Sequence, residues 1–451
     1  PPAHNALGLA LVQQGKLDSA ILAWQRAIQL KADFSEAHAN LGAALAKQDK
    51  HSEAAKVLRR AVQLNPKFPA AQNNLANVLS ELEEMDEAIV HWQAAVELSP
   101  NYFDALTNLG RALQLRGEQA RSLELLERAV AIKPDDPDAR FLRGLGLLTA
   151  GDLPRGFADY HFRLACKDFD VHGRTFPQPA WNGEDVAGKT FLIHTEQGLG
   201  DTIQFIRYAP LLAARGARVI VECPPNLADL LRTVDGVAEV IARPHAPPPF
   251  DVHAAVLDLP RLFGTTLETI PADVPYVSVD PDRAQKWSTE LASEAPHNRI
   301  GLVWSGNPKH ANDRNRSIPL REFEPLAAMS HLTFFNLQKG PAAGQMSDST
   351  LKLKLIDHTT RLQTFADTAA LIAQLDLVIT VDTSVAHLAG ALGKPVWVLL
   401  PKVADWRWML ERTDSPWYPT MRLFRQQTAG DWATVLRELQ AELRRFAPLA
   451  N

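Results

Sequence analysis

Cysteine is scarce in this sequence, with Cys166 and Cys223 the two among 451 residues. They lie far apart and form neither a CxxC pair nor a metal-binding spacing, so they indicate no disulfide scaffold and no zinc site. A reducing, cytoplasmic compartment is the simplest interpretation. The start at Pro1 is compatible with a fragment or with a lost signal peptide.

Long apolar runs and a large excess of charge are also missing. No run approaches the roughly 18 residues of a membrane span. The formal net charge of −5 gives no hint of nucleic-acid binding. Hydrophobic residues make up 46% and charged residues 22%, as in soluble globular proteins. A chain of 451 residues is too long for one ordinary core, so we expect two or three domains.

Common nucleotide-binding and metal-binding motifs are absent as well. Neither GxxxxGK[ST] nor GxGxxG occurs, which argues against a kinase, an ATPase or a dehydrogenase. The second half has no plausible Asp-x-Asp metal motif, and the DDPD of residues 135–138 lies in a connector where it suits a turn and a helix cap. The sequence therefore predicts no cofactor and no bound metal.

A 34-residue repeat fills the first part of the chain. Alanine recurs at 37, 71, 105 and 139 and again at 27, 61, 95 and 129, and proline recurs at 66, 100 and 134. Small residues suit the close approach of two helices, and proline ends each second helix. The pattern AHANLGAALAKQDKHSEAAKVLRRAVQLNP (residues 37–66) resembles the tetratricopeptide repeat (TPR). Four repeats cover about 1–136, and a fifth, over about 138–164, drifts as a capping or docking unit would.

One column of the array suggests a binding role. Asn40, Asn74 and Asn108 recur on the first helix of successive units, the helix that lines the concave face of such an array, while the first repeat has Ala6. A ladder of amides both donates to and accepts from an extended peptide, so it suits a protein acceptor. Asparagine is also common at this slot without such a role, and both interpretations stay open. Oligomerisation through the array is left open too.

From about residue 188, short apolar runs alternate with helical stretches. The runs are TFLIHT, RVIVEC, AEVIA and DVHAAVL, then RIGLVWSG, LTFFNLQ, LKLIDH, DLVITVD and PVWVLL, with a Pro- and Asp-rich stretch at about 271–282 between the two groups. This alternation predicts two Rossmann-like halves facing a cleft. The predicted class is α + α/β, with domains at 1–165, 166–285 and 286–451, and the spacing of residues 431–446 predicts an amphipathic helix.

The ends of four predicted strands carry polar residues, and ligands bind at such ends in open α/β sheets. Asp201, in HTEQGLGDTIQF, is a helix cap or a base. In ITVDTSVAHLAG, Asp382 ends a strand, and Thr383 and Ser384 begin a helix whose N–H groups suit an anion, with His387 one turn in. The other two strand ends are followed by loops rich in hydrogen-bond donors. The first loop contains Ser305, Asn307, Lys309, Arg314 and Arg316, and the second contains Gln338 and Lys339.

Each of these features alone is an ordinary cap or a solvated loop. Together they predict one site, in which an anion-binding helix end and a basic loop face a carboxylate. The tryptophans at 406, 408 and 417 could stack on a sugar or base, but packing of the closing segment is the favoured interpretation.

The second half resembles glycosyltransferase family 9, the heptosyltransferase-like enzymes of GT-B fold. GLGDTIQFIRYAPLLAARGARVIVECPP is similar to that family's N-terminal motif, and DTAALIAQLDLVITVDTSVAHLAGALGKPVWVLLP to its nucleotide-diphosphate motif, within a resemblance over about 188–430. The resemblance implies that Asp201 is the base on the acceptor hydroxyl and that Arg316 contacts the donor phosphates. It further implies that Asp382, Thr383 and His387 hold the diphosphate. We place Gln197 and Gly200 on the acceptor side. On the donor side we place Ser305, Asn307, Lys309, Gln338, Lys339 and Ser384. In GT-B enzymes a last helix braces the N-terminal half, so the resemblance implies this role for residues 431–446.

The combination with a TPR array resembles protein O-glycosyltransferases, including intracellular N-acetylglucosamine transferases and bacterial flagellin glycosyltransferases, in which the array recruits the protein. TSVAH departs from the N-acetylglucosamine enzymes, so the sugar is not carried over. The expectation is a metal-independent, inverting transfer from a nucleotide sugar to a protein Ser or Thr. A glycan or lipid-linked acceptor, or a non-catalytic scaffold, are the alternatives.

Overall fold

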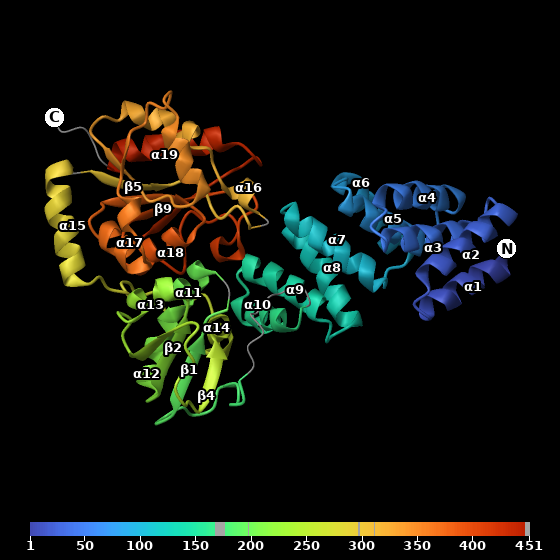
Figure 1. The fold of residues 1–451 in the computed structure, drawn as a ribbon, viewed down its shortest axis with the longest axis horizontal. Coiled ribbons are helices and arrows are strands. Elements are labelled where there is room, and N and C mark those ends of the chain that lie inside the picture. Colours follow the sequence, from blue (N-terminus) through green and yellow to red (C-terminus); the bar gives the residue numbers. More distant parts are fainter. Residues whose placement is uncertain (167–175, 197, 296–297, 311, 447–451) are drawn as a thin grey trace. The chain divides into compact units, whose positions relative to one another are not determined.

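The computed structural model describes residues 1–451 except 167–175, 197, 296–297, 311 and 447–451. The chain forms two compact units, Pro1–Gly146 and Leu147–Asn451 (Figure 1). In the described part of the chain, no helix combines the length and hydropathy that crossing a membrane requires. The predicted α + α/β class is confirmed, because helix pairs form the first unit and parallel sheets the second.

The first unit consists of helix pairs at the predicted spacing. A Cβ atom on Gly42 would lie 2.4 Å from Leu58, and one on Gly110 would lie 2.7 Å from Leu126, so glycine permits the close approach within a pair. The helices are α1 Pro2–Gln13, α2 Leu17–Leu30, α3 Ser35–Ala46, α4 His51–Leu64, α5 Pro69–Glu81, α6 Met85–Leu98, α7 Phe103–Leu115, α8 Gln119–Ile132 and α9 Pro137–Ala150, which continues into the second unit.

The N-terminal half of the second unit is a parallel sheet with the order β3-β2-β1-β4. The helical stretch between the first two strands is interrupted, because Pro210 has no N–H and instead begins a new helix. The elements are α10 Leu153–Tyr160, η1 His161–Ala165, β1 Thr190–His194, α11 Leu199–Phe205, η2 Ile206–Tyr208, α12 Ala209–Ala214, β2 Arg218–Cys223, α13 Pro225–Leu231, β3 Val237–Ala242, β4 Val252–Ala255, η3 Val256–Asp258 and α14 Leu259–Leu262.

The C-terminal half holds a second parallel sheet, ordered β10-β9-β8-β5-β6-β7. The sequence did not predict β10, whose arginines interrupt the apolar pattern, nor α15, which is capped where Asp280 accepts a hydrogen bond from the Arg283 N–H. The elements are α15 Pro281–Glu294, β5 Arg299–Val303, α16 Asp313–Arg316, η4 Leu320–Ala328, β6 Thr333–Asn336, η5 Pro341–Ser347, β7 Leu355–Asp357, η6 Thr359–Arg361, α17 Phe365–Ile372, β8 Leu377–Val381, α18 Ser384–Ala391, β9 Val396–Leu400, η7 Trp406–Trp408, β10 Met421–Arg425 and α19 Trp432–Phe446.

The last helix differs from expectation. We expected residues 431–446 to brace the N-terminal half, but α19 packs on η4 and β10 of the C-terminal half. Figure 1 shows α19 among the elements of that half. Its apolar face, which includes Leu439 and Leu443, joins the core of that half. The amphipathic pattern gave the helix correctly, but it carries no information about which apolar surface the helix covers.

An aromatic cluster joins the two halves of the second unit. Phe157 of α10 packs edge-on against Trp406, with ring centroids 5.5 Å apart, and Phe205 of α11 packs against Trp417 at the same centroid distance. Trp406 and Trp417 are 4% and 0% exposed, so packing is their role. The domain boundary at 165 stays a prediction. The compact units divide at Gly146, and α10 packs within the second unit.

Candidate active site

Asp201 lies in the first turn of α11, just beyond the carboxyl end of β1. Steric constraints explain the two glycines that precede it, Gly198 and Gly200. A Cβ atom on Gly200 would lie 2.8 Å from His387 Cδ2, so α11 approaches α18 more closely than a side chain would allow. A Cβ atom on Gly198 would lie 2.7 Å from the Asp201 carboxylate. The GLGD motif therefore sets α11 directly against α18 and leaves room for the aspartate.

Asp201 is paired with an arginine that the sequence did not single out. Arg407, from η7 of the C-terminal half, donates from Nη2 to Asp201 Oδ1 at 2.6 Å. It also donates to Asp405 Oδ1 at 2.8 Å and from Nε to Gln204 Oε1 at 2.8 Å. The available signal was DWRW (residues 405–408), in which two charged residues alternate with two buried tryptophans. The tryptophans of this motif predicted packing, and the arginine between them was not recognised.

The Asp201 carboxylate is 21% exposed and sits in a charged environment. Burial raises the pKa of Asp201, Arg407 lowers it, and the net shift is upward. A carboxylate with a raised pKa and partial exposure suits general-base chemistry better than an ordinary surface aspartate. This environment supports a chemical role for Asp201 beyond capping a helix.

His387 does not supply the positive charge that we expected. Its Nδ1 lies 3.0 Å from the Tyr418 hydroxyl, and its ring stacks on Trp408 with centroids 5.4 Å apart. The side chain is 4% exposed, and burial, with Arg407 and Arg207 nearby, holds its pKa well below the ordinary value. The imidazole is therefore neutral near pH 7 and contributes packing and hydrogen bonding.

The segment from β8 to α18 forms the predicted strand–helix turn. Thr383 caps α18, because its hydroxyl accepts a hydrogen bond from the Val385 N–H. Burial and the nearby Asp405 raise the pKa of Asp382 to about 6. Ser384 begins the helix, and Gly200 of α11 faces its Cα. Two neighbouring carboxylates repel a diphosphate, so Asp382 suits sugar hydroxyls better than phosphate.

The loop after β5 is held by a glutamine that we had placed in the donor site. Gln338 is 3% exposed, and its Oε1 accepts hydrogen bonds from the N–H groups of Trp304 and Ser305 at 3.1 and 2.8 Å. Its Nε2 donates to the Lys339 carbonyl. These bonds hold the amide against the backbone, so Gln338 shapes the loop. The Ser305 hydroxyl lies 3.2 Å from that of Ser317.

Arg316 lies on α16 and pairs with Asp313 at 3.3 Å. A Cβ atom on Gly306 would lie 2.7 Å from the guanidinium, so the glycine makes space for it. The charge of Arg316 lowers the pKa of Asp382, which brings this loop and the start of α18 into one site. Asn307, Lys309 and Lys339 are exposed. Gln197 lies outside the described residues.

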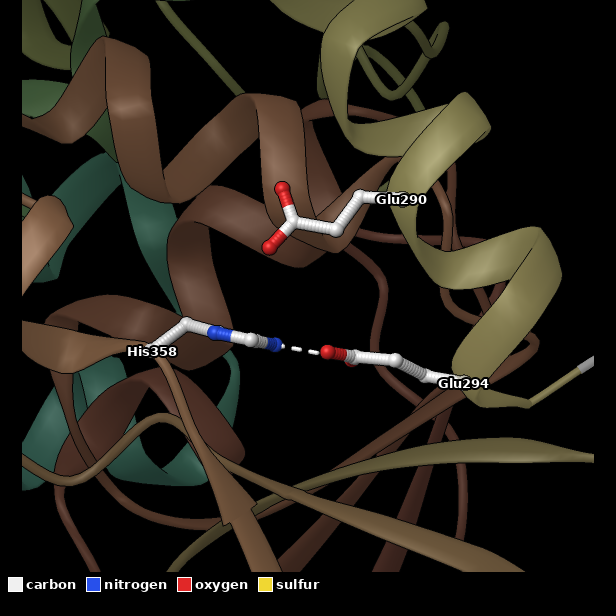
Figure 2. Close-up of side chains that lie close together, drawn as sticks. All are labelled: Glu290, Glu294 and His358. Carbon is white, nitrogen blue, oxygen red and sulfur yellow. Dashed lines mark hydrogen bonds and ion pairs between the residues drawn. The ribbon is translucent and has the colours of Figure 1, made fainter.

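A separate cluster contains groups that could hold a metal ion. Glu290 and Glu294 lie on α15 with His358 facing Glu294, and Nε2 is 2.9 Å from that carboxylate (Figure 2). Arg361 already pairs with Glu290. The cluster therefore carries its own counter-charge, and none of the predicted site residues belongs to it.

In the first unit, the asparagine column is partly occupied by internal bonds. Asn40 donates to Asn5 at 2.9 Å, and Asn108 donates to Asn77 at 3.0 Å. Asn74 is half-buried. A hollow of about 340 Å³ includes the Asn77–Asn108 pair. Its lining residues are Asn77, Phe103, Asp104, Thr107, Asn108, Arg111, Lys133, Asp136 and Asp138.

Family models match separate parts of the chain. TPR models match residues 8–49, 35–68 and 68–135, and the model of glycosyltransferase family 9 (heptosyltransferase) matches residues 359–400. The latter stretch is short, but it contains β8 and α18 and therefore Asp382, Thr383 and His387. Protein FlbA from Caulobacter vibrioides is 29% identical over 332 residues, which are 68% of this chain and 55% of FlbA. The chain thus spans about half the length of this bacterial relative.

Solved structures resemble part of the chain. The crystal structure of MamA is 24% identical, with a TM-score of 0.32, and the match covers 35% of this chain and 92% of MamA. YrrB, described as a TPR protein with an unusual peptide-binding site, is 19% identical with a TM-score of 0.32, over 35% of this chain and 82% of YrrB. The chain carries TPR repeats in its N-terminal part, and their combination with a family 9 match supports a glycosyltransferase.

Proposed function

We propose that the second unit transfers a sugar from a nucleotide sugar to a Ser or Thr hydroxyl of a protein that the TPR array recruits. The observation that carries the proposal is the position of Asp201. Its partly exposed carboxylate stands at the carboxyl end of β1, on a helix packed directly on α18. Helix α18 lies in the segment that matches the family 9 model. Ligands bind at this end of open α/β sheets.

In this proposal Asp201 is the general base. It accepts the proton of the acceptor hydroxyl as that oxygen attacks the anomeric carbon, and the electrons of the broken bond leave with the nucleoside diphosphate. Such base assistance contributes about 10²–10⁴ in rate. Attack opposite the leaving group gives inversion.

The leaving diphosphate needs positive charge and N–H donors. Arg316 and Lys309 of the loop after β5 supply the charge, and the N-terminus of α18 supplies oriented N–H groups. We propose that these protein groups replace a metal ion and make the transfer metal-independent. Asp382, beside Asp405, then accepts hydrogen bonds from hydroxyls of the donor sugar.

The protein acceptor is proposed from the array. TPR matches cover most of the first unit, and its hollow combines amides, both signs of charge and the Phe103 ring, with the Lys133 ammonium 3.8 Å from the ring centroid. Such a mixture suits a polypeptide, whose backbone presents both donors and acceptors. The heptosyltransferase name of the matching family favours a saccharide acceptor as the second candidate.

The first experiment is a thermal-shift panel of ADP, GDP, UDP, CMP and their sugar forms, with and without EDTA. A ligand at 100 times its Kd contributes about 2.7 kcal/mol, which gives a clear shift. The nucleotide sugar that binds is then incubated with a Ser/Thr peptide library and either the wild type or Asp201→Asn, and sugar transfer is measured. We expect EDTA-insensitive binding by both proteins and transfer by the wild type alone. Transfer by Asp201→Asn, retained anomeric configuration, or a strict need for Mn²⁺ would contradict this mechanism.

A further inference from the structure

We propose that Arg407 is a positioning residue for the base: it fixes one oxygen of Asp201, directs the other toward the acceptor, and keeps the carboxylate ionised. This inference rests on the proposed function, because it takes Asp201 to be the base. Arg407 belongs to a segment, DWRW, outside the residues matched by the family 9 model.

The guanidinium of Arg407 is immobilised on several sides. Its side-chain nitrogens donate to Asp201, Asp405 and Gln204 at 2.6 to 2.8 Å. Its Cζ lies 4.3 Å from the centroid of the Trp406 ring, and the side chain is 9% exposed. A planar guanidinium can serve acceptors in different directions at once, which a lysine ammonium on a flexible stem cannot reproduce.

The pairing leaves one carboxylate oxygen of Asp201 available. Arg407 donates to Oδ1, and no residue in the described part of the chain donates to Oδ2. A base with one oxygen fixed and the other unpaired has a defined direction for accepting a proton. Because Arg407 comes from the C-terminal half, this geometry exists when the two halves are together.

The turn that carries Arg407 is itself firmly held. Asp405 accepts a hydrogen bond from the Arg407 backbone N–H at 3.0 Å, which caps η7. Trp406 packs against Phe157 and Tyr160 of α10, with ring centroids 5.5 and 5.9 Å away. The guanidinium therefore stands on a rigid aromatic support, as positioning of a base requires.

The charges around Asp201 come from several elements, and Arg407 is the strongest that favours ionisation. Burial and Asp405 raise the pKa of Asp201, whereas Arg407, Arg163 and His310 lower it. Without Arg407, the cost of burying the charge would be opposed only by weaker partners. The facing groups are Tyr160 of α10, Arg163 of η1, Glu196 after β1, His310 after β5, His387 of α18 and Asp405 before η7.

The first test measures urea unfolding against pH for the wild type, Arg407→Met, Asp201→Asn and the double variant. Burial already raises the folded pKa of Asp201, so the stability that this residue contributes is lost as pH rises through that pKa. Removing Arg407 raises the folded pKa of Asp201 further, so the loss of stability occurs at higher pH and the free energy lost is larger. We expect Asp201→Asn to raise the unfolding midpoint above pH 6 by more in the Arg407→Met background than in the wild-type background. The same response in both backgrounds would overturn the inference.

The second test measures kcat/KM against pH with the donor found in the thermal-shift panel. We expect the acid limb to move up by about one pH unit or more in Arg407→Met, while the nucleotide still binds. Arg407→Lys keeps the positive charge, so its acid limb stays near that of the wild type. It lacks the planar set of donors that fixes the carboxylate, so its kcat falls. Unmoved acid limbs in both variants would overturn the role in ionisation.

The matched control is Arg412→Met, because Arg412 pairs with Asp414 a few residues further along the same segment. We expect it to leave the acid limb in place. If the wild type transfers no sugar from any donor, the proposed function fails while the unfolding comparison still decides whether Arg407 controls Asp201. If Arg407→Met does not fold, Arg407→Gln, which also removes the charge but keeps hydrogen-bond donors, replaces it in both tests with the same expected results.

Discussion

At the residue scale, Gly200 marks the closest approach between α11 and α18. A Cβ atom there would meet His387 Cδ2 at 2.8 Å and the Ser384 Cα at 3.4 Å, and a backbone atom cannot rotate away. We expect Gly200→Ala to lower the free energy of unfolding by about 1–3 kcal/mol, through overpacking. Urea denaturation measures this. Gly344→Ala is the control, because its Cβ atom would meet nothing within 4 Å. Equal stability of the two variants would contradict the argument.

Asp382 gives a prediction with a definite sign. Its folded pKa is about 6, above the ordinary 3.8, so its stabilising contribution is present below about pH 3.8 and is lost as pH rises through 6. Asp382→Asn should therefore gain stability relative to the wild type between pH 4 and pH 8. A shift of this size corresponds to at most about 3 kcal/mol, and partial exposure reduces it to about 1–2 kcal/mol. Urea midpoints at both pH values measure the gain, and a gain independent of pH would contradict it.

The sequence predicted which residues lie at this site better than it predicted their protonation and hydrogen bonding. Asp201, Arg316 and Asp382 come together because strand ends meet at one edge of a sheet, which periodicity reveals. The neutrality of His387 and the structural use of Gln338 depend on burial and on tertiary partners. Arg407 was missed because it acts from the other half, across some two hundred residues of sequence, and no local spacing encodes that contact.

At the scale of elements, η1 carries a fully buried arginine. Arg163 is 0% exposed and donates to Glu196 at 2.6 and 3.0 Å and to Asp258 at 2.8 Å. Burial opposes ionisation of Asp258, but Arg163 and His161 prevail and hold its pKa at about 2. The network thus joins η1 to the end of β1 and to η3. The network lies near the candidate base, since the charge of Asp201 contributes to the raised pKa of Glu196.

We expect Arg163→Met to lower the free energy of unfolding by about 3–5 kcal/mol, because two buried carboxylates lose their partner. The loss should be smaller at the lower pH, because burial raises the pKa of Glu196 and protonation removes its unpaired charge. Urea unfolding at pH 4.5 and 7.5 measures both effects. Arg155→Met is the control, since Arg155 pairs with Asp152 at the surface with its side chain 56% exposed. If Arg163→Met loses no more stability than the control variant, a structural role for the Arg163 ion pairs is contradicted.

Elements with strong periodicity were predicted well, and those with mixed patterns were not. The 34-residue columns gave the array, and the apolar runs gave β1 to β9. The β10 sequence MRLFR reads as partly charged, because an edge strand has one side open to solvent. The partner of α19 was predicted wrongly, since an amphipathic helix packs on whichever apolar surface its connection can reach.

At the scale of the whole molecule, the two units have different proposed roles. Donor binding and proton transfer belong to the second unit, and capture of the protein acceptor belongs to the first. Substitutions in each unit should then change different kinetic parameters, because binding energy from remote parts of a substrate is separable from the chemistry at the reacting atoms. Arg111 is suited to a test, because it is exposed and lines the hollow of the array.

Arg111→Glu reverses a charge at the hollow without removing a buried contact. We expect it to raise KM for a protein acceptor several-fold, since losing one favourable charge contact and adding a repulsive one costs about 1 kcal/mol. The thermal shift by the nucleotide should stay unchanged, and so should kcat at saturating acceptor. Arg60→Glu is the control, an exposed arginine of α4 that does not line the hollow. If both variants raise KM equally, the effect reflects net charge, and if neither does, the acceptor binds elsewhere and a saccharide becomes the better candidate.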